Sequence, residues 1–105
     1  MFEPAIVLAE VAGAVSRARD TELADEAIAY LRHNPTVDLL AIDESLAVRS
    51  AKVAAELRVR GGDAVYIALA EQLQVPLVSW DDEHHSRGGK RVPVYRPSDL
   101  LAEMR

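Results

Sequence analysis

Apolar residues recur along the first half of the chain at the three- and four-residue spacing of a helix that buries one face. Three such helices are predicted, over residues 5–20, 21–33 and 44–60. Thr21 is the expected N-cap of the second helix and Asp43 that of the third, because short oxygen-bearing side chains accept hydrogen bonds from the first free amides of a helix. The sequence therefore predicts three amphipathic helices.

A fourth helix is predicted from a different pattern. The glycine pair 61–62 is expected to end the third helix, and Asp63 then opens the run Ala64–Ala70, which is apolar on nearly every side. A short helix that is apolar all round is buried, because no face of it suits water. The sequence therefore places this segment in the core.

Short apolar runs bounded by turn residues predict the strands. They cover Val37–Ile42, Pro76–Ser79 and Val92–Tyr95. Between the last two lies a polar loop, residues 83–91, and a final helix is expected from Ser98 through Met104. Because helical and strand signals alternate along the chain, the expected fold class is α/β.

Length and composition limit the possible kinds of protein. A chain of 105 residues is expected to form one domain, residues 1–105. The absence of cysteine excludes disulfides and thiolate metal sites, which fits a reducing, cytoplasmic setting. No run is long enough for a membrane helix. The net charge of −5 argues against binding nucleic acid by charge alone, but it is compatible with an enzyme that holds cations on carboxylates.

Three acidic residues stand where a ligand site is expected. Glu10 lies beside the apolar face of the first helix, Asp63 opens the buried helix, and Asp81 directly follows a predicted strand. Ligands of open parallel sheets bind at this edge of the strands. Converging carboxylates repel one another unless a cation lies between them, and Mg²⁺ and Mn²⁺ prefer such oxygen ligands. A metal held there polarises a phosphodiester and activates water.

Each of these acids also has a purely structural interpretation. Asp63 is a suitable helix N-cap, Glu10 can hold its carboxylate in water at the helix edge, and Asp81 can open a turn. The pair His84 and His85 could recruit a metal, but adjacent residues on a short loop rarely point the same way. Residue spacing alone leaves these alternatives open.

Three segments carry a family resemblance. They are Pro4–Val11, with its helical Glu10; Gly62–Glu71, with the order Asp-Ala-x-Tyr-x-Ala-Leu-Ala; and Pro76–Asp81, an apolar strand followed by Ser-x-Asp. In order and separation they resemble three motifs of the PIN-domain ribonucleases, especially the VapC-type toxins of toxin–antitoxin pairs. The resemblance implies a three-layer α/β/α fold with a parallel sheet.

By this resemblance, Glu10, Asp63 and Asp81 are the catalytic and metal-binding acids, and the cofactor is Mg²⁺ or Mn²⁺. The implied reaction is hydrolysis of RNA phosphodiesters, and the implied partners are an RNA substrate and an antitoxin protein. An antitoxin of this family lays a helix and tail across the toxin, with a basic side chain in the acidic site. A chain with a net charge of −5 suits such a partner.

The chain departs from the family pattern at its start. The family begins with a strand that ends in an acidic residue, followed by one or two helices and a short second strand. No residue before Glu10 is predicted to form any of these elements. We therefore expect an N-terminally truncated, partial PIN-like domain that lacks one catalytic acid. The gap would expose apolar helix faces, which predicts a homodimer.

Two other functions remain open from the sequence. The chain could be a non-catalytic remnant that binds a partner, either a second copy or an antitoxin-like peptide. It could also be a different doubly wound domain, such as a response-regulator-like fold, which likewise places acids at strand ends. The match around Asp63–Leu69 argues against the second of these, because a buried apolar helix that opens with Asp is not the site of such folds.

Overall fold

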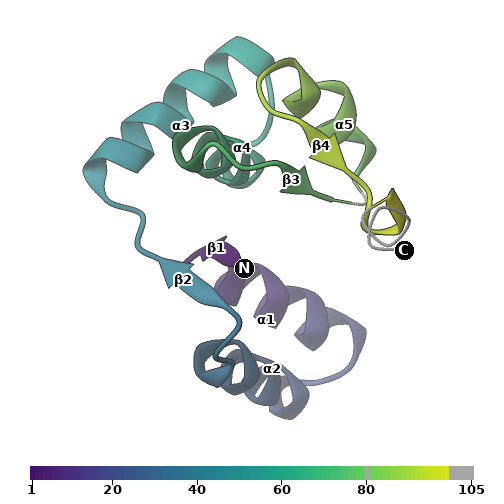
Figure 1. Cartoon of the computed structure of the whole chain (residues 1–105). Coiled ribbons are helices and arrows are strands. Elements are labelled where there is room, and N and C mark those ends of the chain that lie inside the picture. Colours follow the sequence, from purple (N-terminus) through teal and green to yellow (C-terminus); the bar gives the residue numbers. More distant parts are fainter. Residues whose placement is uncertain (80, 100–105) are drawn as a thin grey trace. The chain divides into compact units, whose positions relative to one another are not determined.

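The computed structural model describes residues 1–79 and 81–99 (Figure 1). Its elements are, in order, β1 (Phe2–Pro4), α1 (Val7–Ala18), α2 (Thr21–His33), β2 (Asp38–Leu40), α3 (Glu44–Leu57), α4 (Gly61–Leu73), β3 (Leu77–Val78), α5 (Asp82–Ser86), the 3₁₀ turn η1 (Gly88–Lys90) and β4 (Val94–Tyr95). Helices with two small parallel sheets give an α/β fold, as predicted. Residues 100–104 of the predicted final helix lie outside the described residues. Within the described part of the chain, no helix has the length and apolarity needed to cross a membrane.

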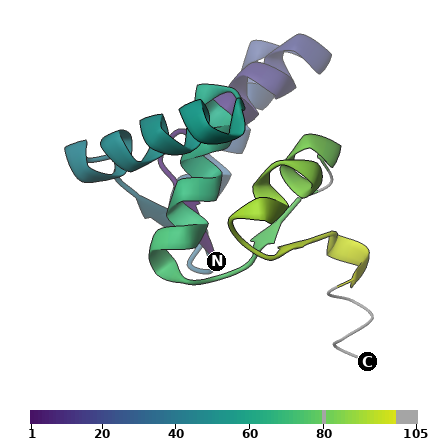
Figure 2. The same cartoon turned by 90° about the horizontal axis from the view of Figure 1, so that it is seen from above.

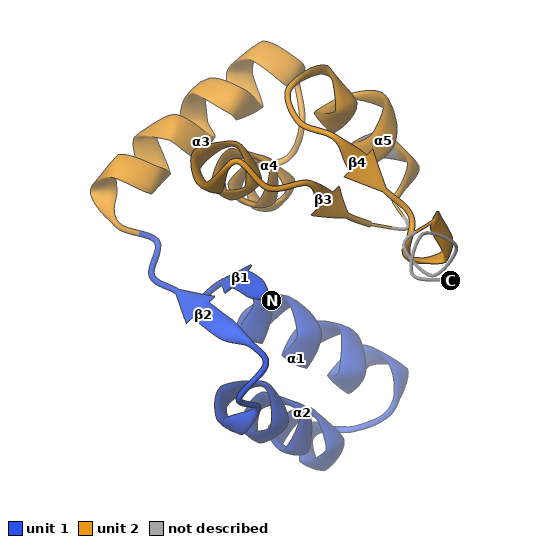
Figure 3. Ribbon diagram, in the orientation of Figure 1, with its two compact units in different colours: residues 1–42 blue, residues 43–105 orange. Residues whose placement is uncertain are grey.

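The chain divides into two compact units (Figure 3). Unit 1 spans Met1–Ile42 and unit 2 spans Asp43–Arg105. In unit 1, β1 pairs with β2 in parallel, with Pro4 opposite Leu40, and α1 packs against α2. The prediction that no strand precedes the first helix is wrong. A strand of three residues is too short to show the alternation by which strands are recognised in a sequence.

The helices of unit 1 begin close to their predicted positions. The N-cap of α2 is Asp20 rather than the predicted Thr21, and its Oδ1 accepts a hydrogen bond from the amide of Leu23 at 2.8 Å. Both residue types are good caps, and the backbone decides between them: Asp20 is extended, whereas Thr21 is already helical. The helix therefore starts where the chain turns rather than at the first suitable side chain.

Unit 2 contains a hydrophobic core built around α4. Its buried residues are Ala64, Val65, Ile67, Ala68, Leu69 and Ala70. Helix α3 lies beside α4 (Figures 1 and 2) and adds Leu46 and Val53 to this core. The prediction that the all-apolar segment is a buried helix is confirmed, because only a helix covered on every side removes all of these side chains from water.

The boundary between α3 and α4 differs from the prediction. Asp43 caps α3 as expected, accepting from the amide of Leu46 at 2.8 Å. The helix, however, ends at Leu57, where Arg58 takes the left-handed conformation with φ 56°. The glycine pair 61–62 does not end α3 but begins α4. An arginine here makes the turn for which a glycine was expected.

The segment after β3 is more regular than its sequence suggests. The strands β3 and β4 pair in parallel, with Leu77 opposite Val94 and Val78 opposite Tyr95, inside the two predicted runs. The predicted loop 83–91 is instead largely helical, containing most of α5 and all of η1. Polar residues dominate both turns, so the hydrophobic pattern gives no sign of them.

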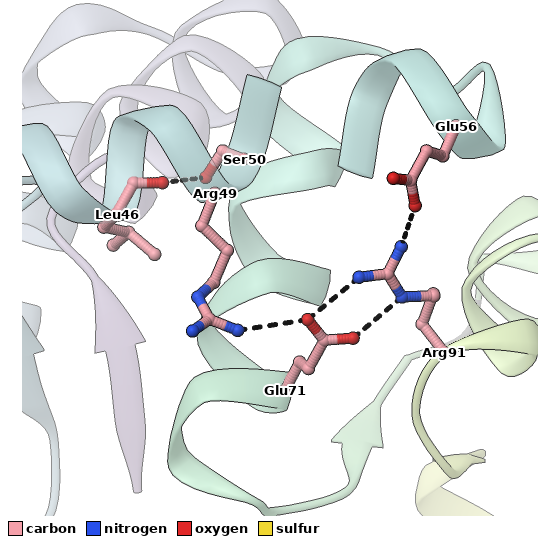
Figure 4. A network of polar contacts seen from close by, with 6 residues as sticks. All are labelled: Leu46, Arg49, Ser50, Glu56, Glu71 and Arg91. Carbon is pink, nitrogen blue, oxygen red and sulfur yellow. Dashed lines mark hydrogen bonds and ion pairs between the residues drawn. The ribbon is translucent and has the colours of Figure 1, made fainter. Parts of the chain in front are cut away.

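A network of ion pairs joins this segment to the helices (Figure 4). The guanidinium of Arg91 donates to both carboxylate oxygens of Glu71, at 2.8 and 3.0 Å, and also to Glu56. Arg49 donates to Glu71 from α3 at 3.1 Å. The hydrogen bonds from Arg91 are the largest cause that lowers the pKa of Glu71. The network fixes the chain between η1 and β4 against α3 and α4.

Candidate functional site

Asp63 does not act as the N-cap of the buried helix. It is the third residue of α4, and the N-cap position belongs to Arg60, which makes no side-chain capping bond. The capping interpretation of Asp63 is therefore wrong. Its carboxylate, with the side chain 25% exposed, instead accepts a hydrogen bond from the imidazole of His84 in α5.

His84 joins Asp63 to the end of β3 through its two ring nitrogens. Its Nε2 lies 2.8 Å from Oδ1 of Asp63, and its Nδ1 lies 2.8 Å from Oγ of Ser79. The side chain of His84 is only 12% exposed, so both contacts are largely shielded from water. The ring of Tyr66 in α4 lies next to that of His84, with the centroids 6.5 Å apart.

Hydrogen-bonding capacity assigns the direction of each bond in this cluster. A carboxylate only accepts, so Nε2 of His84 carries the proton that bonds to Asp63. In a neutral ring Nδ1 is then an acceptor, and it receives the hydroxyl proton of Ser79. The same hydroxyl oxygen accepts from the amide of Asp81 at 3.0 Å. With a neutral ring, each hydrogen bond from Asp81 through Ser79 and His84 to Asp63 therefore has one donor and one acceptor.

Asp81 lies at the other end of the same histidine. It directly precedes α5, and its Oδ1 accepts from the backbone amide of His84 at 3.3 Å. Asp81 therefore opens a turn after the strand, as its structural interpretation predicts, and this turn leads into α5. Its side chain is also exposed, so the carboxylate can still bind a ligand. The structure brings Asp63 and Asp81 to the two sides of His84.

Glu10 lies in the first turn of α1, on the exposed part of unit 1. Its charge acts on Glu3 in β1, an acid that was not among the predicted site residues. Burial raises the pKa of Glu3, the ammonium group of the N-terminus opposes this shift, and the negative charge of Glu10 adds to it. The structure thus groups the acids as Glu3 with Glu10 in unit 1 and as Asp63 with Asp81 in unit 2.

The two adjacent histidines point to different partners, as predicted. His85 directs its Nε2 to the backbone carbonyl oxygen of Ser79 at 2.7 Å, whereas His84 contacts the hydroxyl of the same residue. Both histidines therefore hold Ser79, but only His84 also reaches a carboxylate. The pair does not form a shared metal ligand.

The carboxylates of Asp63 and Asp81 are the kind of ligand that a hard divalent cation prefers, but two side chains are too few to enclose one. Among the described residues, no group of three or more His, Asp or Glu side chains could hold a metal ion. Asp63 and Asp81 supply two carboxylates beside one histidine, and Mg²⁺ is often bound by one or two carboxylates together with water and phosphate oxygens. The pair fits an open site completed by substrate rather than a closed cage.

Sequence reasoning selected the two acids of this cluster but missed Ser79 and His84 as their links. The available signal was spacing: Ser79, Asp81 and His84 follow at intervals of two and three residues directly after a strand. Those intervals place a serine turn and one helical turn in succession, so the histidine folds back over the serine. The contact with Asp63, 21 positions earlier, has no local signal.

The family comparison covers nearly the whole chain. Residues 1–90 match the family model described as PIN domain, a range that contains Glu10, Asp63, Asp81 and both residues that link the two aspartates. No curated protein and no solved structure matched the chain. Because the match covers far more than half of the 105 residues, the chain belongs to the PIN domain family.

Proposed function

We propose that this chain is a VapC-type ribonuclease of a toxin–antitoxin system that hydrolyses RNA phosphodiesters with Mg²⁺ or Mn²⁺. Membership of the PIN domain family indicates a nuclease-type function and RNA binding. The proposed metal-binding and catalytic acids are Glu10, Asp63 and Asp81. The observation that carries the proposal is the carboxylate of Asp63, which caps no helix and is held beside Asp81 by His84.

The residues of unit 2 supply a preorganised acidic site. Asp63 projects from a helix whose other side is buried, and Asp81 is fixed at the junction between β3 and α5. Both carboxylates would bind the cation. The metal, when bound, stabilises charge on the phosphate and lowers the pKa of a water molecule. The carboxylates orient that ion, and the hydrogen bonds of Ser79 and His84 keep them in place.

We also propose that residues 1–105 act as one domain with the three-layer α/β/α arrangement of the family. The family match extends through unit 1 and most of unit 2, which supports a shared role for the two units. A cytoplasmic homodimer that binds an antitoxin completes the proposal. The charge of −5 and the exposed carboxylates of Glu10 and Asp81 favour a partner with basic side chains.

A cleavage assay on single-stranded RNA tests the proposed function. The wild-type chain is expected to cut RNA in Mn²⁺ or Mg²⁺ and to lose this activity in EDTA. Asp63→Asn is expected to abolish cleavage, because it removes the charge that binds the ion. Asp25→Asn, an exposed position on α2, is the matched control and retains full activity. Cleavage that survives Asp63→Asn would exclude the assigned role of Asp63.

A second candidate, a non-catalytic module that binds a partner, is favoured by the surface of unit 1. Phe2 and Tyr30 are 51% and 67% exposed, and α1 buries none of its residues. A bound partner would cover large apolar side chains that are left exposed in this way. Light scattering at micromolar concentration tests it: a dimer without RNA cleavage supports this candidate, and metal-dependent cleavage by a monomer contradicts it.

A further inference from the structure

We propose that His84 is the positioning residue of the acidic site. It orients the carboxylate of Asp63 through its ring and the carboxylate of Asp81 through its backbone amide. This inference rests on the proposed function and extends it, since none of the family motifs in this chain includes His84. Among the residues described, His84 is a largely covered residue that bonds Asp63 with its ring and Asp81 with its backbone amide.

His84 contacts the two aspartates with different parts of the residue. A single residue bonds Asp63 at its ring tip, at 2.8 Å, and Asp81 at its backbone amide, at 3.3 Å. The two aspartates come from different elements, separated by 18 positions in the sequence. His84 is thus the shared link that fixes where one carboxylate lies relative to the other.

Contacts at both ring nitrogens fix the orientation of the His84 ring. Nε2 donates to Asp63, and in the neutral ring Nδ1 then accepts from the hydroxyl of Ser79. The ring is 12% exposed and lies against Tyr66, which restricts its rotation. A donor held in this way occupies Oδ1 of Asp63 and leaves Oδ2 to bind a cation. Hydrogen bonds that orient metal-binding carboxylates in this manner typically contribute 10- to 100-fold to metal affinity.

Ser79, His84 and Asp63 are of the three residue types that form nucleophilic triads in hydrolases, but Ser79 is bonded differently here. Here the hydroxyl oxygen of Ser79 accepts from the amide of Asp81 at 3.0 Å, and its carbonyl oxygen accepts from His85 at 2.7 Å. The serine is therefore held inside the turn between β3 and α5. Its place in the cluster is that of a bridge between His84 and Asp81 rather than of an attacking group.

The first experiment measures the ring of His84 directly and needs no metal. Nitrogen NMR of the full chain is expected to show the tautomer with the proton on Nε2, at a pH where the ring is neutral. Ser79→Ala and Asp63→Ala each remove one of its partners and are expected to produce a mixture of tautomers. A wild-type mixture, or a ring that does not respond to Asp63→Ala, overturns the proposal.

The second experiment measures Mn²⁺ binding to the full chain by calorimetry. His84→Phe keeps an aromatic ring against Tyr66 and removes both ring hydrogen bonds, so we expect binding 10- to 100-fold weaker than wild type. His84→Gln restores a donor toward Asp63 and is expected to recover most of the loss. His33→Gln is the matched control: it replaces an exposed histidine at the end of α2 in unit 1 and leaves the affinity unchanged.

Two comparisons between variants separate a loss of folding from a loss of Mn²⁺ binding, and the role of His84 from the proposed function. If His84→Phe fails to fold, as judged by circular dichroism, the difference between His84→Gln and Ser79→Ala decides the outcome: recovery in the first and loss in the second support the proposal. Wild-type affinity in a folded His84→Phe overturns it, even where Asp63→Asn abolishes RNA cleavage and so upholds the proposed function. A wild-type chain that binds no Mn²⁺ refutes the proposed function, and the NMR result then still decides whether His84 orients Asp63.

Discussion

Units 1 and 2 are built from the same kinds of element, a helix pair and a two-stranded parallel sheet, but they differ in how much they bury. Among residues 1–42, all of which the structure describes, only Pro4 and Ala24 are buried. In unit 2, α4 alone buries six residues, among them Ile67, which has no exposed surface. The difference arises in sequence: α4 is apolar all round, whereas α1 carries a single apolar face.

This comparison shows why the acidic pair of unit 2 can be held firmly. Asp63 projects from α4, which has more buried residues than any other described helix, and its partner His84 is itself largely covered. Glu10 projects from α1, which buries no residue. A segment of about 40 residues seldom stabilises itself without a metal, a disulfide or a partner. Unit 2 therefore carries its own core, and unit 1 needs further contacts.

The largest expected effect comes from the core of unit 2. Ile67→Ala leaves a cavity in the fully buried centre of α4 and is expected to lower the free energy of unfolding by about 2–5 kcal/mol. Val15→Ala in α1, a half-buried position, is the matched change in unit 1 and costs about 1 kcal/mol or less, because water already reaches the site. Urea unfolding measures both. Equal losses would contradict the difference in burial between the units.

The next effect concerns the ion-pair network. Glu71→Gln removes the charge that Arg91 and Arg49 contact and is expected to cost about 2 kcal/mol at neutral pH. Arg91 lowers the pKa of Glu71 below its ordinary value of 4.5, so the ionised form is favoured in the folded state. The contribution is thus complete above that value and is lost as the pH falls through the lowered pKa.

The pH dependence separates this effect from a general loss of packing. Thermal unfolding of wild type and Glu71→Gln is measured from pH 7 down to pH 3, and the gap in stability is expected to close at the acidic end. A gap that stays constant would show that the charge of Glu71 contributes nothing. Glu22→Gln, exposed on α2 of unit 1, provides the control.

A smaller effect is expected where η1 touches the core. A Cβ added to Gly88 would lie 3.2 Å from Cδ1 of Ile67, so Gly88→Ala forces the isoleucine to shift and costs about 1–2 kcal/mol. Gly89→Ala meets no atom within 4 Å and is expected to be neutral. Combining Gly88→Ala with Ile67→Val, which removes Cδ1, should recover part of the loss. Without such recovery the contact with Ile67 is not the cause.

The smallest effect compares matched N-caps in the two units. Asp43 caps α3 and Asp20 caps α2, and each accepts an amide hydrogen bond at 2.8 Å. Replacing either with Ala removes one bond and is expected to cost about 1 kcal/mol. Hydrogen exchange followed by mass spectrometry should show local fraying of α2 in Asp20→Ala and a loss spread over the α3–α4 core in Asp43→Ala. The same local pattern in both would mean that the units are equally cooperative.

The features that depend on local pattern could be predicted without the structure. The spacing of apolar residues gave the helices, the continuous apolar run gave the buried α4, and Asp43 was identified as a cap because an acidic residue there suits the first amides of a helix. Prediction from local pattern was wrong for β1, for the helical turns of α5 and η1, and for the end of α3 at Arg58. These elements are short, or their stability comes from contacts with distant residues.

The way the candidate site is held follows from contacts between residues that are distant in the sequence. The sequence marked Asp63 and Asp81 as acids at element ends, but it could not show that one histidine bonds both of them. The contact between His84 and Asp63 joins residues 21 positions apart, and it forms because α4 is buried and α5 folds back against it. Local pattern fixes what each segment becomes, whereas the pairing of distant polar groups depends on the packing that brings those segments together.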